Sequence, residues 1–427
     1  MNIKNFSRKR IADGVHFSCY KDKRFQKNRI EIFFSDVLDR KNASLNALIT
    51  AVLARSNNRY KTMQELNNRL SELYASCIND FVENNSDLQD FGLYSYSLCN
   101  EYAFDGENVL EEIATMLRDC IFDPYLEDGC FPKAVVELQK QNLIDANDNE
   151  INNKGRYASI RANEIAFQDE PAAVRHLGEN EDIKKITAEA AYKRYLEILE
   201  TKNVEIICVG PADYKIVEEI FTKAFAKINR RPETKPRTKR SIIKAEPAVV
   251  TEIMDIEQSK LVMIYKSDYD EKLWKHATLA AYMLGGDVSS KLFTIVREKL
   301  SLCYYCSSRF GRGKFAMTVS SGVEKENLNK TITAINEQLD ELCKGNFTDE
   351  DMKKSKLSIG TALKASNDYM DSISTWISGC IYDDDYTMPE EKIKHFEAIT
   401  REEIIAAAQS MKLDTVYTLT SKEEKTE

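Results

Sequence analysis

The most informative segment of the chain is LGGDVSSKLF at residues 284–293, followed by VREKLSLCY at 296–304. Two adjacent glycines after an apolar run predict a tight turn, and we expect Ser289 or Ser290 to cap the helix that follows. The turn lacks the G-x-G-x-x-G and G-K-[ST] patterns of phosphate-binding loops. A structural turn is therefore favoured over a phosphate site.

The end of this stretch has a counterpart in the first half of the chain. RLSELY at 69–74 resembles KLSLCY at 299–304, at an offset of about 230 residues. Short apolar runs predict a buried strand in each half, and each is followed by an Ala/Leu-rich helix; the two strands are at 28–34 and 260–265, and the helices at 45–54 and 276–284. The order of elements repeats.

Longer helices follow in both halves. Apolar residues at three- and four-residue spacing predict amphipathic helices that begin near Val109 and Leu328. Thr187 and Thr400 each precede a Glu-containing helix start and are expected to be N-caps, with Glu403 completing a capping box for Thr400.

The remaining strands complete the predicted fold. Each capped helix leads into a strand, at 204–209 and 416–419, and the segments 303–310 and 314–322 are expected to form a hairpin. The sequence therefore predicts an α+β fold of two homologous domains, each an antiparallel β-sheet packed with helices.

The sequence of residues 284–304 resembles that of the pitrilysin and mitochondrial-processing-peptidase family of zinc peptidases, the M16 or insulinase family. Its members carry GG-x-x-S-S-R-L-F followed by V-R-E-K-x-G-L-A-Y, and Ser301 and Cys303 stand here where the family has Gly and Ala. Weaker similarity extends over nearly the whole chain, through the two Ile-Thr-x-Glu helix starts and the strand that ends at Gly210. The resemblance implies a clam-shell of two domains.

Active members of this family hold zinc with an inverted H-x-x-E-H motif on a first-domain helix, together with a more distant carboxylate. In the matching helix, NALITAVLA at 46–54, Ala47 and Ala51 occupy the two His positions and Thr50 the Glu position. Neither Glu137 nor Glu150 can be chosen as the third ligand. The resemblance thus implies a zinc-less bacterial member, with no metal and no cofactor.

The histidine count leads to the same expectation without any alignment. The chain has four histidines, each at least 100 residues from the next: His16, His176, His276 and His395. Cys303-x-x-Cys306 has the spacing of half a zinc ribbon, but no second C-x-x-C accompanies it, so packed core thiols are favoured. No Ser/His or Cys/His pair is visible that would activate a nucleophile.

The resemblance also implies substrate-binding residues. Arg297 and Tyr304 match the pair that active members bring from the second domain to the peptide backbone and the developing oxyanion. An alternative is that Arg297 forms an ion pair inside its domain and Tyr304 packs in the core. Family members also add substrate as a strand to a first-domain edge, and Ala75, Ser76 and Cys77 begin the nearest counterpart of that edge.

Composition narrows the class of protein. The chain of 427 residues has 60 Lys and Arg against 69 Asp and Glu, a formal charge of -9, which disfavours nucleic acid as a partner. Ten scattered cysteines indicate reduced thiols, as in a reducing compartment. The first 20 residues lack the apolar core of a signal peptide, and no apolar run reaches about 18 residues. We therefore expect a cytoplasmic protein without a membrane partner.

A basic segment divides the chain. Residues 229–244, NRRPETKPRTKRSIIK, hold seven Lys or Arg, one Glu and two prolines. Because proline interrupts the run and no aromatic residue accompanies it, an exposed linker is favoured over a nucleic-acid patch. The expected organisation is a first domain at 1–230, a linker at 231–248 and a second domain at 249–427.

These observations predict a catalytically inactive homologue of the family that binds extended peptide. The expected partner is a zinc-bearing M16 chain in a heterodimer, or a second copy in a homodimer. Two alternatives stay open: a stand-alone peptide-binding or protein-binding module, and a peptidase with an unrecognised site.

Overall fold

The computed structural model describes residues 5–422; residues 1–4 and 423–427, the outermost ends of the two expected domains, lie outside the described residues. The chain divides into two compact units. Unit 1 comprises Met1–Asp148, Val174–Arg237 and Ser366–Met388, and unit 2 comprises Asn149–Ala173, Thr238–Ala365 and Pro389–Glu427. Each half of the sequence therefore contributes one segment to the unit built mainly from the other half.

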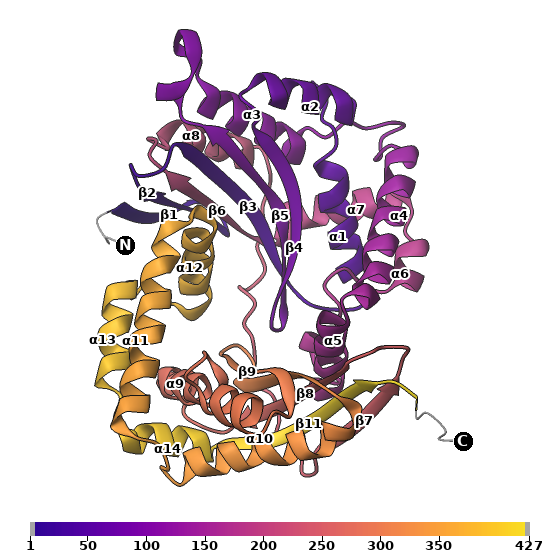
Figure 1. The fold of residues 1–427 in the computed structure, drawn as a ribbon. Coiled ribbons are helices and arrows are strands. Elements are labelled where there is room, and N and C mark those ends of the chain that lie inside the picture. The colour runs from indigo at the N-terminus through magenta and orange to yellow at the C-terminus, as the bar shows by residue number, and fades with distance from the viewer. Residues whose placement is uncertain (1–4, 423–427) are drawn as a thin grey trace. The chain divides into compact units, whose positions relative to one another are not determined.

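Unit 1 is built on a six-stranded sheet in the order β1-β2-β6-β3-β5-β4 (Figure 1). Its central strand β3 alternates, so that Ile30 and Ile32 face one apolar cluster and Phe33 faces another. Both faces of the sheet are therefore covered. The strands are β1 (Phe6–Ala12), β2 (Val15–Lys21), β3 (Lys27–Val37), β4 (Cys77–Asn85), β5 (Leu88–Leu98) and β6 (Asn203–Gly210).

Helices from the first half of the chain cover the face that carries Ile30 and Ile32. These helices are amphipathic or buried, and their apolar residues form the larger core of unit 1. They are α1 (Ala43–Leu53), α2 (Met63–Glu72), α3 (Val109–Phe122), α4 (Lys133–Asn149), α6 (Asn180–Lys184), α7 (Ala188–Thr201) and α8 (Lys215–Phe225).

The opposite face of this sheet is covered by a helix from the second half of the chain, α12 (Met370–Asp383). Its residues Met370, Ile373, Ile377 and Ile381 repeat at helical spacing and pack on Phe33 and its neighbours. This packing joins the segment 366–388 to unit 1.

Unit 2 has a five-stranded sheet in the order β7-β11-β8-β10-β9. Leu261 and Met263 of β8 face the main core, whereas Val262 and Ile264 face a smaller cluster. The strands are β7 (Ala248–Ile253), β8 (Ser259–Ser267), β9 (Cys303–Gly311), β10 (Ala316–Val323) and β11 (Met411–Thr420). The helices from the second half are α9 (Trp274–Gly285), the π-helix η7 (Leu292–Lys299), α10 (Leu328–Cys343), α11 (Asp349–Ala365), α13 (Pro389–Ala398) and α14 (Arg401–Gln409).

The smaller cluster of unit 2 is formed with a helix from the first half, α5 (Lys154–Ala166). Ala158, Ala162 and Ala166 form a stripe of small side chains on α5 that packs on Val262 and Ile264. Alanines four residues apart let the helix approach the sheet closely. Helices α5 and α12 thus occupy equivalent positions on the two sheets.

The predicted repeat is confirmed as an order of elements. The series from β3 through β6 in the first half matches the series from β8 through β11 in the second, element by element. The strand orders β2-β6-β3-β5-β4 and β7-β11-β8-β10-β9 also match. Thr187 and Thr400 cap α7 and α14 as predicted, and Glu403 completes the capping box.

The expectation of purely antiparallel sheets is wrong, because both sheets are mixed. In unit 1 β2 pairs with β6 in parallel, and in unit 2 β7 pairs with β11 in parallel. Each parallel pair joins strands separated by most of one half of the chain, so the long connection leaves either direction open. The strand patterns in the sequence carry no information on that direction.

The basic segment at 229–244 contains no helix or strand, and four of its cations donate to backbone carbonyls: Arg230, Lys235, Arg240 and Lys244. In unit 1 Lys235 Nζ donates to Ile381 O at 2.7 Å, at the C-terminus of α12. In unit 2 Lys244 Nζ donates to Ile165 O at 2.8 Å, at the C-terminus of α5. The two lysines therefore cap the two helices.

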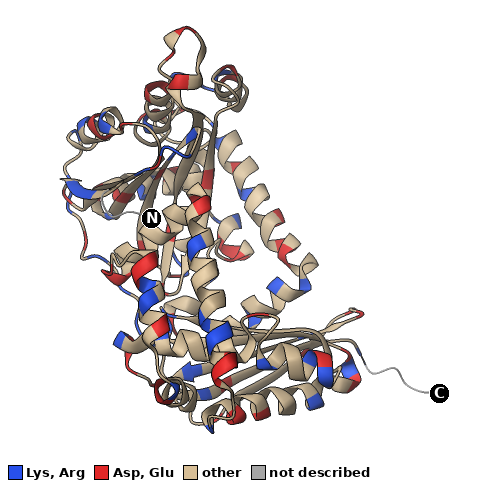
Figure 2. Cartoon of the chain, turned by 60° about the vertical axis from the view of Figure 1, so that its left-hand side comes forward, with Lys and Arg blue, Asp and Glu red and all other residues tan. Residues whose placement is uncertain are grey.

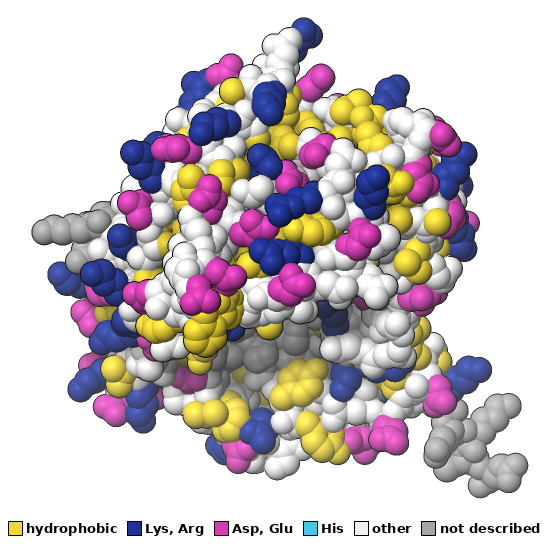
Figure 3. All heavy atoms as spheres, turned by 90° about the horizontal axis from the view of Figure 1, so that it is seen from above, with side chains coloured by type: hydrophobic (Ala, Val, Ile, Leu, Met, Phe, Trp, Pro, Cys, Tyr) yellow, Lys and Arg dark blue, Asp and Glu magenta, His cyan; other side chains and the backbone are white. Residues whose placement is uncertain are grey.

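Charged residues of both signs are interspersed along the helices (Figure 2). On the face seen in Figure 3, Lys and Arg lie among Asp, Glu and hydrophobic side chains. Within residues 5–422, no helix combines the length and the apolar character needed to cross a membrane.

Candidate functional site

Helix α1 carries the three positions at which the family motif is replaced. Ala47, Thr50 and Ala51 are all buried, in a helix whose residues are nearly all buried. The Thr50 hydroxyl donates to Ala47 O at 2.9 Å, within its own helix. Two methyl groups and an internally bonded hydroxyl offer nothing that a metal could use.

Zinc, which the resemblance implies for active relatives, does not fit this helix. Tetrahedral zinc needs imidazole, thiolate or carboxylate ligands. Among residues 5–422, no group of three or more His, Cys, Asp or Glu side chains could hold a metal ion. Glu137 pairs instead with Lys140 at 2.9 Å, and Glu150 lies 3.7 Å from Arg156.

A buried polar network stands beside the replaced motif, and sequence reasoning missed it. Asn46, the residue before Ala47, donates to Gln89 Oε1 at 2.8 Å and accepts from Arg194 Nε at 3.1 Å. Arg194 also pairs with Asp36, which Lys202 approaches at 2.9 Å. An asparagine inside an apolar helical run was the available signal, because a buried amide needs partners. The network ties α1 to side chains of β3, β5 and α7.

The predicted strand edge on unit 1 is present but begins later than expected. β4 begins at Cys77 and hydrogen-bonds only to β5 among the described strands, so it is an edge of the sheet. Ala75 and Ser76 belong to the preceding turn, in which Tyr74 and Ala75 have positive φ of 58° and 54°. The Ser76 hydroxyl donates to Leu73 O. The unpaired edge therefore starts at Cys77.

In unit 2, Arg297 lies on η7 with 38% of its side chain exposed. Its guanidinium stacks on the Phe293 ring at 4.4 Å and lies 3.5 Å from Glu298. Tyr304 is 59% exposed, and its hydroxyl donates to Glu324 at 2.6 Å. Neither residue is locked in a buried core pair.

The turn that leads to Arg297 differs from the predicted one. Ser289 and Ser290 do not cap the following helix; Asp287 Oδ1 accepts from both the backbone N–H and the hydroxyl of Ser289, at 2.8 and 2.7 Å. An aspartate side chain that bonds the backbone two residues later is a common turn former, which explains this result. At Gly285, a Cβ would lie 2.6 Å from the Ser308 nitrogen, so close packing against β9 requires glycine.

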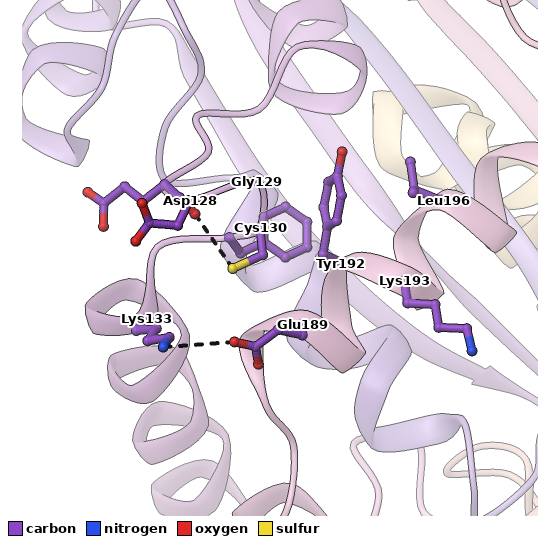
Figure 4. A pocket seen from close by; sticks show the side chains of 10 residues that line it. Asp128, Gly129, Cys130, Lys133, Glu189, Tyr192, Lys193 and Leu196 are labelled. Carbon is purple, nitrogen blue, oxygen red and sulfur yellow. Dashed lines mark hydrogen bonds and ion pairs between the residues drawn. The ribbon is translucent and has the colours of Figure 1, made fainter.

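Unit 1 also has a surface pocket of about 370 Å³ between α4 and α7 (Figure 4). The turn Asp128–Gly129, with positive φ at both residues, forms one wall, and Tyr192 stands on the α7 side. Lys133 and Glu189 pair across it at 3.8 Å. Neither the replaced motif positions nor the β4 edge residues line this pocket.

Comparison with known proteins agrees with this architecture. Residues 185–359 match the family model described as the Peptidase M16 inactive domain. A protein of Bacillus subtilis (strain 168) named "Probable inactive metalloprotease YmfF" is 28% identical over 382 residues, which cover 87% of this chain and 88% of that protein.

Two solved structures have the same fold. A conserved protein from Enterococcus faecalis V583 has a TM-score of 0.90 at 22% identity, covering 99% of this chain and 100% of the other. A peptidase M16 inactive domain from Pseudomonas fluorescens has a TM-score of 0.78 at 16% identity, with 99% and 100% covered.

The fold and the matched model point to one class: residues 185–359 carry the Peptidase M16 inactive domain. Over most of its length the chain is also similar to the Bacillus subtilis protein named a probable inactive metalloprotease. The resemblance drawn from residues 284–304 is thereby confirmed.

Proposed function

We propose that this chain is a non-catalytic M16 homologue that binds extended peptide and supports a zinc-bearing M16 chain in a heterodimer. The observation that carries the proposal is helix α1, in which Ala47, Thr50 and Ala51 replace the ligands and the base and are buried. A peptidase of this class needs a metal to generate hydroxide at neutral pH. The chain has retained the binding elements without that chemistry.

Metal content and activity test the first part. We expect the purified chain to contain far less than one zinc per molecule and to leave unfolded polypeptide uncleaved, with or without added zinc. About one zinc per chain, or cleavage that a chelator abolishes in a preparation free of other peptidases, would contradict it. That result would favour a peptidase with an unrecognised site.

Peptide binding by strand addition has the β4 edge as its support. An extended peptide that adds to an edge strand forms main-chain hydrogen bonds through every second residue. We therefore expect a fluorescein-labelled unstructured peptide to bind, and N-methylation at one set of alternate residues to weaken binding far more than methylation at the other set. Equal effects of the two methylated peptides would argue against strand addition.

Arg297 and Tyr304 are the proposed contacts from unit 2. The partial exposure of Arg297 and its loose pairing with Glu298 leave donors for peptide carbonyls. We expect Arg297→Ala to weaken peptide binding by about 1.5–3 kcal/mol, roughly ten- to a hundred-fold in Kd, and to leave the melting temperature nearly unchanged. Arg309→Ala, on the exposed face of β9, is the matched control. A large drop in melting temperature with unchanged binding would give Arg297 a structural role.

The heterodimer is tested by capture of the chain from its native cell. The expected partner is a homologous chain that contains an intact H-x-x-E-H motif and restores peptidase activity when it is mixed with this chain. Peptide binding by a chain that captures no such partner would favour the stand-alone binding module.

A further inference from the structure

Two cysteines lie in the first four residues of β9, the edge strand of unit 2. Cys303 is the first residue of β9 and is half-buried, whereas Cys306 is only 5% exposed. In a regular strand, residues three apart point to opposite faces of the sheet. A C-x-x-C pair in a strand is therefore normally separated.

A β-bulge removes that separation. Opposite β9, Gly322 pairs with Tyr305 and the adjacent Val323 pairs with Cys303, so that Tyr304 has no partner of its own on β10. One extra residue in a strand returns the following side chains to the face of those before the bulge. In agreement, Cys303 and Cys306 pack against the same apolar cluster.

The two side chains therefore lie on the same face of the sheet, and Cys306 is the cross-strand partner of Ser321 on β10. The neighbouring Cys306 thiol lowers the pKa of Cys303 to about 7, with a smaller contribution from the positive charge of Arg297. The Cys303 thiol and burial raise the pKa of Cys306. Cys303 is therefore the more exposed and more acidic thiol, and the buried Cys306 lies on the same face of the strand.

We propose that Cys303 and Cys306 form a reversible disulfide by exchange with a low-molecular-weight disulfide. The Cys303 thiolate attacks one sulfur of the small disulfide, and the first small thiolate leaves as a mixed disulfide forms. Cys306 then loses its proton to solvent and attacks the Cys303 sulfur, which expels the second small thiolate. Two protein thiols are oxidised and one external disulfide is reduced, so atoms and electrons balance.

The product would close a ring around Tyr304 and Tyr305 and fix the bulge that carries them. The other cysteines differ in their surroundings; Cys343, also half-buried, is the best comparison, because burial raises its pKa. The proposal rests on unit 2 alone and does not depend on peptide binding.

The full chain is incubated with mixtures of oxidised and reduced glutathione, quenched with acid and alkylated. Cleavage after Lys299 and Arg309 gives a peptide, residues 300–309, whose only cysteines are 303 and 306. We expect this peptide to lose both alkylation sites and two hydrogens in oxidising mixtures, and to regain both sites with dithiothreitol. Cys343 should stay alkylated, and in the reduced chain it should be alkylated at least about ten-fold more slowly than Cys303.

Single variants separate the two thiols. Cys306→Ser should accumulate glutathione on Cys303, because no second thiol can release it, and Cys303→Ser should leave Cys306 unmodified. If the peptide carries alkyl groups on both cysteines at every glutathione ratio, the proposal is wrong. Glutathione that stays on Cys303 in the unsubstituted chain would overturn it equally.

Discussion

The two sheets are covered in the same way by helices of opposite character. On unit 1, α12 places large aliphatic residues on the sheet, and the carboxyl of Asp90 is buried beside Ser35 and Tyr382. On unit 2, α5 places a stripe of alanines, and buried Lys266 lies 3.2 Å from Asp414. The helices at equivalent positions of the repeat therefore pack on their sheets through side chains of different size, alanines on α5 and large aliphatic residues on α12.

The two units also differ in how they accommodate a buried charged side chain, Lys266 in unit 2 and Asp90 in unit 1. Lys266 satisfies its charge with Asp414 and with the carbonyls of Ala166 and Ile242, at 2.7 and 2.9 Å, so it also caps α5. Asp90 has hydroxyl partners but no cation among the contacts that stabilise it, and burial raises its pKa to about 6. Unit 2 holds a compensated pair, whereas unit 1 holds a carboxyl whose charged form is disfavoured by burial.

The largest expected effect comes from breaking the buried pair of unit 2. Lys266→Met should lower the free energy of unfolding by about 4 kcal/mol, because it removes the closer of the two lysines that pair with the buried Asp414 carboxylate and leaves Lys244, at 3.3 Å, to balance that charge. Lys412→Met, at an exposed position of β11, should cost less than about 0.5 kcal/mol. Urea denaturation measures both, and equal small effects would mean that the pair contributes no more than a surface contact.

Removing an aliphatic anchor of α12 should come next. Ile377 is fully buried on the unit 1 sheet, and Ile377→Ala should cost about 3 kcal/mol through lost burial and a residual cavity. Leu357→Ala, on the exposed face of α11, is the control and should be nearly neutral. A cost for Ile377→Ala as small as that of its control would show that α12 is only loosely attached to the sheet.

Neutralising Asp90 should stabilise unit 1. Because its folded pKa of about 6 lies above the usual 3.8, ionisation of Asp90 destabilises the fold progressively as the pH rises from about 4 to 6, and the full cost is present above pH 6. Asp90→Asn should therefore raise stability by about 2 kcal/mol at pH 8, and the advantage should disappear as the pH falls from 6 to 4. Asp145→Asn, an exposed control, should change little at any pH. A pH-independent gain would exclude titration of Asp90 as the cause.

The smallest expected effect concerns the lysine caps from the basic segment. Lys235→Met removes the donor to Ile381 O and should cost about 0.5–1 kcal/mol, since it uncaps α12 without stranding a charge. Lys244→Met should cost more, because Lys244 also pairs with Asp414. Thermal melts of the two variants rank them, and the reverse order would refute the assignment of Lys244 to both roles.

Much of the fold could be predicted from local patterns. The buried strands that became β3 and β8, the helices α1 and α9, and the caps Thr187 and Thr400 each depend on a few neighbouring residues, and each was found. Asn46 and its network could not be found, since its partners Gln89 and Arg194 are distant in sequence. The direction of the β2–β6 pair depends likewise on how a long connection runs.

The order of elements, the family resemblance and the loss of the zinc ligands can be derived from the sequence, because periodicity, a continuous motif and the absence of imidazoles at positions 47 and 51 are local properties. The tertiary structure was needed to show that α5 and α12 each cover the sheet built mainly from the other half, because the apolar face of a helix can pack on either sheet. It alone also brought Cys303 and Cys306 together, because a β-bulge is set by the register between two strands, which neither strand specifies alone.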